Sequence, residues 1–402
     1  MKDFKLICTK CQKTFFINSM HYVCDHCHEP LELEMIQEGK IRQGNILSQT
    51  IMERYADFFP FLSFNQEVSL GEGFTPLVRS KKIAAALGIN HLYFKNETQN
   101  PTWSFKDRGT LSGIQHAMAL GYKKIGTVST GNMAVSVAAY GSRAGLETFV
   151  FVNKSIAPEK LNPIAIYHPH LIKVEGDYGA LYFESLSIGK ENDIYFINSD
   201  VPFRVEGYKT LAYEICEQMD FDIPDYVIVP TSAGGNIRGI EKGFQEFKNC
   251  GYIDKVPKMI CAQASGCSPI YQAYLNDEEI ISRFEHPNTI AHAIENPFPP
   301  SGNQVLRKLR EKDGIFVAVS DEEIVKAQAM LAAEGIFAQP ASVVPLAAVK
   351  KLKETHLLQG DEKIACVITG SGLKYTAAFE KHDLNAMTCR LEDLHDFIST
   401  KF

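Results

Sequence analysis

Four cysteines near the N-terminus have the spacing of a metal site. Cys8 and Cys11 form one Cys-x2-Cys pair, and Cys24 and Cys27 form a second pair after 12 intervening residues. Each pair can place two thiolates on one side of a tight turn, and two such turns can surround a tetrahedral zinc or iron ion. Two alternatives are that a neighbouring histidine replaces one sulfur, or that reduced cysteines fill a small hydrophobic cluster. The segment offers no general base, so we interpret the ion as structural.

A lysine with possible nucleophilic character lies between a turn-rich segment and a helical pattern. Lys106 belongs to the sequence NETQNPTWSFKDRG, and the run that follows it, GTLSGIQHAMALG, predicts a helix. The amino end of a helix carries a partial positive charge, which disfavours an ammonium group and lowers the pKa of a lysine there. Such an amine can attack a carbonyl carbon. The alternative is an ordinary solvated lysine.

Three glycine-containing loops follow apolar runs that predict strands. They are 130–132 in VSTGNMAVS, 232–236 in VIVPTSAGGNIRG and 369–372 in CVITGSGLKY. Glycine lets the backbone approach a ligand closely, and a helix that begins after the loop offers unpaired N–H groups to an anion. The middle loop is the best phosphate cradle. It lacks the P-loop pattern, and the first strand is not followed by GxGxxG, so a dinucleotide fold is disfavoured. The alternative for each loop is a plain connecting turn.

The segments that must position these residues alternate between strand and helix patterns. Apolar runs predict strands at 123–129, 146–152, 170–176, 193–198, 225–230, 258–264 and 363–369. Helical patterns between them predict an α/β fold with βαβ units and a mainly parallel sheet covered by helices on both faces. Ligands of such sheets bind at the carboxyl ends of the strands, where the three loops lie. The turn-rich PFPPSGN (297–303) is interpreted as an irregular connection between helices.

Composition excludes several classes of protein. The 402 residues carry 41 basic and 48 acidic side chains without a basic stripe, which argues against a nucleic-acid surface. No apolar run approaches the ~20 residues that a membrane span needs, and the N-terminus has no signal-peptide pattern. The six later cysteines lack paired spacing, which favours reduced thiols. We therefore expect a cytoplasmic protein without nucleic-acid or membrane partners.

Together these motifs resemble the threonine synthases, which are fold-type II pyridoxal-phosphate enzymes. The matching segments are NPT-x-SFKDR, STGN-x-A-x-SVAAY, TSAGGN and TGSGLK, together with LGEGFTPL (70–77), NSDVPFRVEGYKTLAYE (198–214) and EGIFAQPAS (334–342). The double-CxxC leader resembles the zinc-ribbon extension of some archaeal and bacterial members. The resemblance covers nearly the whole chain, with its motifs in the expected order.

The resemblance implies a fold like that of the tryptophan synthase β-subunit. Two three-layer α/β domains with parallel sheets would enclose the cofactor, pyridoxal 5′-phosphate, and a small ribbon would hold a structural zinc ion. The expected division places the ribbon at 1–35, a large cofactor-binding domain at 36–109 and 206–402, and a small domain inserted at 110–205. A homodimer is expected from the family.

The resemblance also implies a role for individual residues. Lys106 would form the covalent link to the cofactor and move protons, Asn132 would lie beside the cofactor's 3′-oxygen, and Thr369 would lie at the pyridine nitrogen. The implied cofactor-binding set is Lys106, Phe105, Asn132, Ser232, Ala233, Gly234, Gly235, Asn236 and Thr369. The implied substrate-binding set is Ser104, Ser129, Thr130, Gly131, Ser199 and Arg204, and the implied metal ligands are Cys8, Cys11, Cys24 and Cys27.

The reaction implied by the family converts O-phosphohomoserine, an amino-acid phosphate, and water to threonine and phosphate. The sequence departs from the common family pattern at Trp103, Met133, Ala233, Gln339 and Ser371. Met133 and Ala233 are expected to remove polar contacts from the pocket for the substrate phosphate. These changes leave open a related enzyme that eliminates or replaces a β-substituent of O-phosphoserine, serine or threonine. A non-catalytic zinc-ribbon protein is disfavoured, because Lys106, Asn132 and Thr369 are present.

Overall fold

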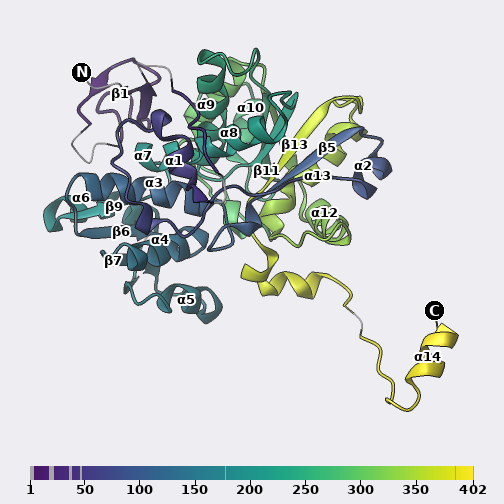
Figure 1. Ribbon diagram of the computed structural model, residues 1–402. Coiled ribbons are helices and arrows are strands. Elements are labelled where there is room, and N and C mark those ends of the chain that lie inside the picture. The colour runs from purple at the N-terminus through teal and green to yellow at the C-terminus, as the bar shows by residue number, and fades with distance from the viewer. Residues whose placement is uncertain are drawn as a thin grey trace.

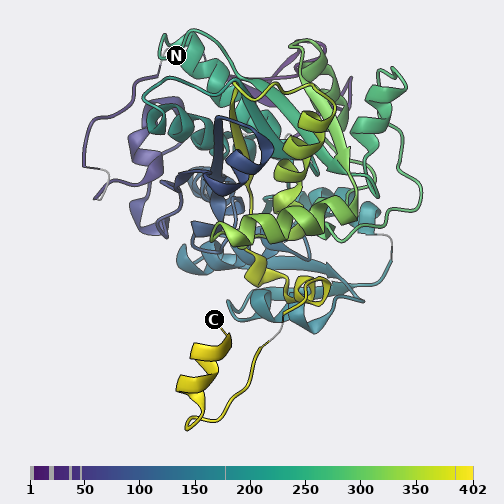
Figure 2. The same cartoon turned by 90° about the vertical axis from the view of Figure 1, so that its right-hand side faces the viewer.

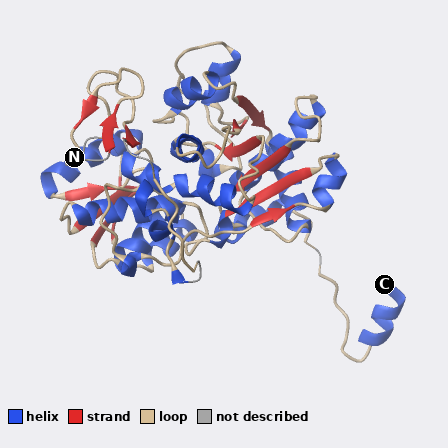
Figure 3. Ribbon diagram, turned by 45° about the horizontal axis from the view of Figure 1, so that its top comes forward, coloured by secondary structure: helices blue, strands red, loops and turns tan. Residues whose placement is uncertain are grey.

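Three β-sheets organise the chain in the computed structural model, which describes residues 4–17, 22–35, 39–45, 48–176, 178–384 and 386–401 (Figure 1). A six-stranded sheet and a four-stranded sheet form the body, and a three-stranded sheet forms a ribbon near the N-terminus. Figure 3 shows the strands gathered in these separate groups, with helices packed around them. The predicted α/β fold is confirmed.

The six-stranded sheet has the strand order β12-β11-β10-β13-β5-β4. Its strands are β4 (Leu77–Arg79), β5 (His91–Asn96), β10 (Tyr226–Pro230), β11 (Lys258–Ala264), β12 (Ile315–Val319) and β13 (Lys363–Ile368). Neighbouring strands pair in parallel except at the edge, where β4 runs antiparallel to β5. The central strands are buried on both faces, which explains why they read as continuous apolar runs.

The four-stranded sheet has the order β8-β7-β6-β9, and all of its pairs are parallel. Its strands are β6 (Lys124–Val128), β7 (Glu147–Asn153), β8 (His170–Val174) and β9 (Ile194–Phe196). Each overlaps a run that the sequence predicts as a strand, with ends that differ by at most two residues. All four strands come from the segment between α3 and α7, so this sheet interrupts the sequence of the larger one.

Helices cover both faces of both sheets. On the large sheet, α9 packs against Val227 and Val229, whereas α13 packs against Ile228, whose side chain points to the other face. On the small sheet, α4 and α6 belong to two different apolar clusters in the same way. The body helices are α1 (Ile51–Arg54), α2 (Lys82–Leu87), α3 (Lys106–Ala119), α4 (Asn132–Arg143), α5 (Pro158–Ala165), α6 (Tyr178–Asn192), α7 (Pro202–Gly207), α8 (Lys209–Gln218), α9 (Gly235–Asn249), α10 (Pro269–Leu275), α11 (Gly302–Arg310), α12 (Asp321–Ala333) and α13 (Pro340–Glu354).

The ribbon consists of β1 (Phe4–Ile7), β2 (Thr14–Phe15) and β3 (Glu32–Met35), all paired antiparallel. Leu6, Leu31 and Leu33 are buried and belong to the same apolar cluster as the core of the body. Strand β3 contacts α7. The ribbon is therefore packed onto the body rather than hanging from it.

The last helix, α14 (Leu394–Lys401), stands apart from the body at the end of an extended segment in two perpendicular views (Figures 1 and 2). Its described residues are exposed, apart from the half-buried Phe397. Within the described ranges, no helix has both the length and the hydrophobicity needed to cross a bilayer.

Candidate active site

The loop before Lys106 is bonded directly to the loop after β13. The amide of Phe105 donates to the carbonyl of Thr369 at 2.9 Å, and the amide of Ser371 donates to the carbonyl of Trp103 at 3.0 Å. Ser104 forms an isolated β-bridge with Gly370 between these two bonds. The structure thus brings two distant motifs together at the carboxyl end of the large sheet. Lys106 is the first residue of α3, which begins three residues before the predicted helical run.

Gly370 is the point where this pair of loops meets two other segments. The amide of Gln339 donates to the Gly370 carbonyl at 3.0 Å, and the Asn132 side chain donates to Gln339 Oε1 at 2.8 Å. A Cβ atom at Gly370 would lie only 3.2 Å from Gln339 Oε1 and 3.4 Å from Asn132 Nδ2, so a larger residue would push this pair away. Thr369 Oγ1 lies 2.9 Å from Ser342 Oγ at the start of α13. Four motifs therefore converge at one sheet edge.

The amino group of Lys106 has an unusually low proton affinity. Burial lowers its pKa from 10.5 to about 7, and the positive charge of Arg204 contributes in the same direction. Its Nζ lies 4.5 Å from the centroid of the Phe105 ring, which in turn packs against Tyr208. A large fraction of this lysine is therefore neutral near pH 7, which is the state that attacks a carbonyl carbon.

A buried network of charges holds the first turn of α3. Arg108 contacts Glu97 through two hydrogen bonds of 2.6 and 2.8 Å, and Glu214 through two more of 2.6 and 2.9 Å. Lys95 donates to the same Glu214 at 2.5 Å. These four side chains are almost inaccessible to solvent. Because Glu97 follows β5 and Glu214 lies on α8, the network fixes Lys106 relative to both elements.

The predicted phosphate loop, 232–236, joins β10 to α9. Gly234 has φ = 96° and Gly235 begins the helix, so the first N–H groups of α9 face an anion-binding position at the carboxyl end of β10. A Cβ atom at Gly235 would lie 2.7 Å from the carbonyl oxygen of Ser199, so Ser199 packs directly on the loop. Both polar atoms of the buried Asn236 amide lack a hydrogen-bond partner among the described residues. The loop has the donors and the close backbone approach that a phosphate group requires.

The predicted substrate residues lie in separate parts of the site. Ser104 is fully buried, and its hydroxyl has no partner within the described part of the chain. Gly131 is exposed, while Ser129 and Thr130 are half-buried just before α4, whose first residue is Asn132. Arg204 lies on α7 behind Lys106 and donates to Tyr208 Oη, Thr110 Oγ1 and the Lys106 carbonyl at 3.0, 3.1 and 3.4 Å. These bonds leave two of its five donors for another acceptor.

Met133 has a packing role. It is 7% exposed and belongs to the main apolar cluster of the body. Ala233 is half-buried, and its carbonyl accepts a hydrogen bond from the amide of Ser301 at 3.0 Å. Trp103 is 51% exposed beside the lysine loop.

Two ionisable residues of this region were missed by sequence reasoning. Asp107 accepts hydrogen bonds from Thr102 and Ser136, yet burial outweighs them and raises its pKa to about 6. Lys374 donates to the Thr102 carbonyl at 2.6 Å, and burial lowers its pKa to about 8. Both lie inside the matched motifs, SFKDR and TGSGLK. Their position in these motifs could have identified them as site residues from the sequence.

The four N-terminal cysteines form one cluster, as their spacing predicts. Their sulfur atoms all lie within 4.8 Å of one another, and Cys11 and Cys24 are 3.7 Å apart. A tetrahedral zinc site with Zn–S bonds of about 2.3 Å requires sulfur atoms about 3.8 Å apart. The Cys27 amide also donates to Cys24 Sγ at 3.4 Å, which orients that sulfur. The donor set and its spacing fit a tetrahedral thiolate site.

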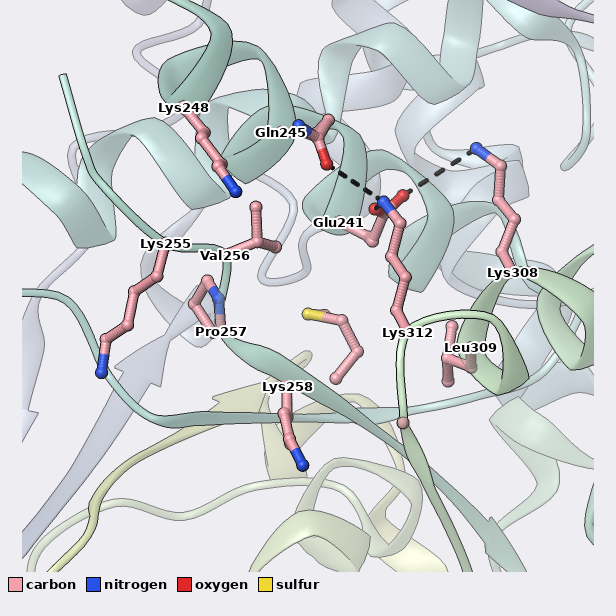
Figure 4. Close-up of a pocket in the computed structure, with 12 residues that line it drawn as sticks. Glu241, Gln245, Lys248, Lys255, Val256, Pro257, Lys258, Lys308, Leu309 and Lys312 are labelled. Atoms are coloured by element: carbon pink, nitrogen blue, oxygen red, sulfur yellow. Dashed lines mark hydrogen bonds and ion pairs between the residues drawn. The ribbon is translucent and has the colours of Figure 1, made fainter. Parts of the chain in front are cut away.

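A separate cavity of about 330 Å³ lies at the other end of the large sheet (Figure 4). Its lining includes Lys258, the first residue of β11, and it therefore lies at the amino ends of the strands. Lys312 and Lys308 both point toward the buried Glu241 on α9 in Figure 4. None of the predicted site residues lines this cavity.

Comparisons with known proteins identify the family. Residues 68–370 match the family model described as pyridoxal-phosphate dependent enzyme. The chain is 41% identical to a threonine synthase of Methanocaldococcus jannaschii over 91% of this chain and 92% of that protein. It is 35% identical to a threonine synthase of a Bacillus species over 87% of this chain and 97% of that protein.

Solved structures support the same fold at lower identity. A threonine deaminase from Solanum lycopersicum matches with a TM-score of 0.64 and 20% identity, covering 77% of this chain and 88% of that one. Maize serine racemase matches with a TM-score of 0.63 and 22% identity, covering 81% and 92%. The chain belongs to the family of pyridoxal-phosphate-dependent enzymes and, within it, to the threonine synthases.

Proposed function

We propose that this chain catalyses the conversion of O-phosphohomoserine and water to L-threonine and phosphate, as a pyridoxal-phosphate-dependent lyase. The observation that carries the proposal is its similarity to threonine synthases over about nine-tenths of both chains. The convergence of Lys106, Asn132 and Thr369 at one sheet edge supports it.

The cofactor fits the residues that would hold it. The 232–236 loop supplies helix N–H groups and an unsatisfied Asn236 amide for the phosphate group. Lys106 would bind the aldehyde carbon, and Asn132 would lie beside the 3′-oxygen. The Thr369 hydroxyl, which is neutral, would face the pyridine nitrogen.

When bound, pyridoxal phosphate withdraws electrons from the α-carbon of an amino acid. Lys106 would then remove the α-proton and afterwards a β-proton, because its amine is partly neutral near pH 7. Phosphate would leave from the γ-carbon of the substrate, and that carbon would take up a proton to become a methyl group. Water would add its hydroxyl at the β-carbon, and the α-carbon would regain a proton.

The substrate would be held at both of its ends. The turn Ser129–Gly131, together with Ser104, would bind the carboxylate through hydroxyl and backbone N–H donors. Ser199 and the two remaining donors of Arg204 would bind the substrate phosphate. This assignment needs no polar group at Met133, whose side chain is packed in the core.

We also propose the domain division, the metal and the assembly. Residues 36–109 and 206–402 would form the large domain and 110–205 the inserted small one, supported by the separate strand sets of the two sheets. The four cysteines of the ribbon would bind zinc. The protein would act as a homodimer in the cytoplasm, as the family resemblance suggests.

The test is a substrate panel with the purified protein and added pyridoxal phosphate. O-phosphohomoserine should yield equimolar phosphate and threonine, while O-phosphoserine and serine should yield little pyruvate. Lys106→Ala should lose turnover by at least about 10³-fold, because it removes both the covalent anchor and the proton carrier. Lys82→Ala, an exposed lysine on α2, is the matched control and should keep full activity.

Turnover of O-phosphoserine or serine without turnover of O-phosphohomoserine would replace the proposal with a β-elimination or β-replacement activity. Failure of every substrate in a preparation that binds pyridoxal phosphate would refute a role in this reaction class.

A further inference from the structure

Helix α11 begins against the phosphate loop. The amide of Ser301, the residue before α11, donates to the carbonyl of Ala233 at 3.0 Å. A Cβ atom at Gly234 would lie 2.8 Å from Ser301 Cβ, so the loop and the helix start are in direct contact. Ser301 is fully buried. The PFPPSGN segment, interpreted from the sequence as an irregular connection, thus supports the phosphate loop from behind.

The later turns of the same helix contact residues beside both cysteine pairs. Arg307 forms two hydrogen bonds of 2.7 Å with Glu29, which follows Cys27 by two residues. Arg307 and Gln304 also donate to Thr9 Oγ1 at 3.1 and 2.8 Å. Thr9 lies between the first two cysteines of the ribbon. One helix therefore touches the phosphate loop at its start and the ribbon along its length.

A second connection runs through charged side chains. Arg238, in the first turn of α9, donates to Ser301 Oγ at 2.8 Å and to Glu32 of β3 at 3.3 Å. Lys308 of α11 donates to the same Glu32 at 2.7 and 3.0 Å. Burial opposes ionisation of Glu32, but the charges of Lys308 and Arg238 outweigh it and lower its pKa to about 2. Glu32 is therefore a buried anion that ties α9 and α11 to the ribbon.

Lys308 has limited freedom to find another partner. Besides Glu32 it lies 3.8 Å from Glu241 of α9, and Figure 4 shows Glu241 already shared with Lys312. Lys308 would thus stay where it is if the Glu32 charge were removed. Arg238, by contrast, would lose its buried carboxylate partner. Within the described residues, Arg238 would keep only neutral acceptors, Ser301 Oγ and the Leu31 carbonyl at 3.3 Å. A buried guanidinium without a carboxylate partner is costly, and a shift toward another acceptor would relieve that cost. Its bond to Ser301, directly behind the phosphate loop, is the contact that such a reorientation would disturb.

We propose that Glu32 and Arg238 are positioning residues for the cofactor's phosphate group, and that the ribbon sets the geometry of the 232–236 loop through Ser301. The inference rests on the proposed function, because it assumes that this loop binds the phosphate of pyridoxal phosphate. The ribbon then acts on cofactor binding without touching the cofactor.

Glu32 and Glu34 provide a matched pair for the test. Both lie on β3, but Glu32 is buried against Arg238 and Lys308, whereas Glu34 is an exposed partner of Lys5. We would measure dissociation constants for pyridoxal phosphate and for pyridoxal with the wild type, Glu32→Gln and Glu34→Gln. Pyridoxal can bond to Lys106 but carries no phosphate, so it reports the lysine loop alone.

Glu32→Gln should weaken binding of pyridoxal phosphate on the order of tenfold, as loss of a group that orients direct ligand contacts does at metal sites. Binding of pyridoxal should not change, and Glu34→Gln should bind both compounds like the wild type. Equal affinity of Glu32→Gln and wild type for pyridoxal phosphate would overturn the inference. Equal losses for both compounds, in a variant that unfolds at the wild-type temperature, would also overturn it.

Ser301→Ala is the second variant, because it removes only the hydroxyl that accepts from Arg238. If Glu32→Gln does not fold, Ser301→Ala decides the matter: a loss confined to pyridoxal phosphate supports the inference, and wild-type affinity refutes it. A wild-type protein that binds neither compound would instead refute the proposed function.

Discussion

The lysine loop and the phosphate loop of the candidate site are held in different ways. Residues 103–108 are fixed from within the body, by main-chain bonds to the loop after β13 and by the buried charges around Arg108. The 232–236 loop is supported from behind by Ser301, Arg238 and, through them, by the ribbon. The lysine proposed to react with the cofactor is therefore held by the core of the body. The loop proposed to bind the cofactor's phosphate depends instead on contacts with the N-terminal ribbon.

The largest expected effect comes from removing Arg108, whose buried ion pairs support the lysine loop. Arg108→Met would leave Glu97 and Glu214 as buried carboxylates without their guanidinium partner, and the free energy of unfolding should fall by about 3–5 kcal/mol. Denaturant unfolding measures it. Arg79→Met removes an exposed arginine of β4 and should change the unfolding free energy by less than about 0.5 kcal/mol. A small change in Arg108→Met would show that the lysine loop has another support.

Removing the metal should affect the phosphate loop, 232–236. Chelation, or Cys24→Ser, should loosen both cysteine turns and their contacts with Arg307 and Gln304 of α11. Affinity for pyridoxal phosphate should fall on the order of tenfold while affinity for pyridoxal is kept. Zinc content is measured in parallel by elemental analysis. If the metal-free protein binds pyridoxal phosphate normally, the phosphate loop does not depend on the ribbon's ion.

The pH dependence of covalent attachment tests the electrostatics of the lysine loop. Because the pKa of Lys106 is lowered to about 7, the rate of pyridoxal attachment should rise with pH through that value and then level off. Arg204→Gln removes a nearby positive charge, so the pKa should increase and the rise should move to higher pH. Arg204→Lys keeps the charge and should leave the midpoint closer to that of the wild type. Identical midpoints in all three proteins would exclude Arg204 as a cause.

The smallest effect concerns the contact between Gln339 and Asn132. Gln339→Ala removes one hydrogen bond of 2.8 Å, which is worth about 0.5–1.5 kcal/mol. We expect kcat/KM to fall about two- to tenfold, with a loss of unfolding free energy no larger than the value of that hydrogen bond. Gln359→Ala, at an exposed turn, should have no effect. A much larger loss would mean that Gln339 itself touches the substrate or the cofactor.

Much of the sheet could be predicted from the sequence. Strands such as β6, β10 and β13 are buried on both faces, so they appear as short apolar runs followed by glycine turns. The helix after Lys106 was predicted from a turn-rich segment followed by a helical pattern, and α3 begins three residues before the predicted run. Three strands of this sheet, β4, β5 and β12, lie outside the predicted runs. The antiparallel edge strand β4 has three half-buried or exposed residues, which leave no pattern.

The support of the phosphate loop could not be predicted. Glu32 and Arg238 are separated by 206 positions, and the sequence around each residue does not predict contact with the other. Ser301 lies in a proline-rich segment that reads as a connection, since turn residues describe backbone shape and not what the turn packs against. The convergence of the cysteines was predictable, because its spacing is itself the signal.

The most direct test of the central claim asks which lysine holds the cofactor. Borohydride reduction of the protein with bound pyridoxal phosphate, followed by peptide mass spectrometry, locates the modified residue. Lys374 is the informative competitor, because it lies near the same loops and burial lowers its pKa to about 8. The account predicts one modified residue per chain, at Lys106. Modification at Lys374 instead, or scattered over surface lysines, would contradict it.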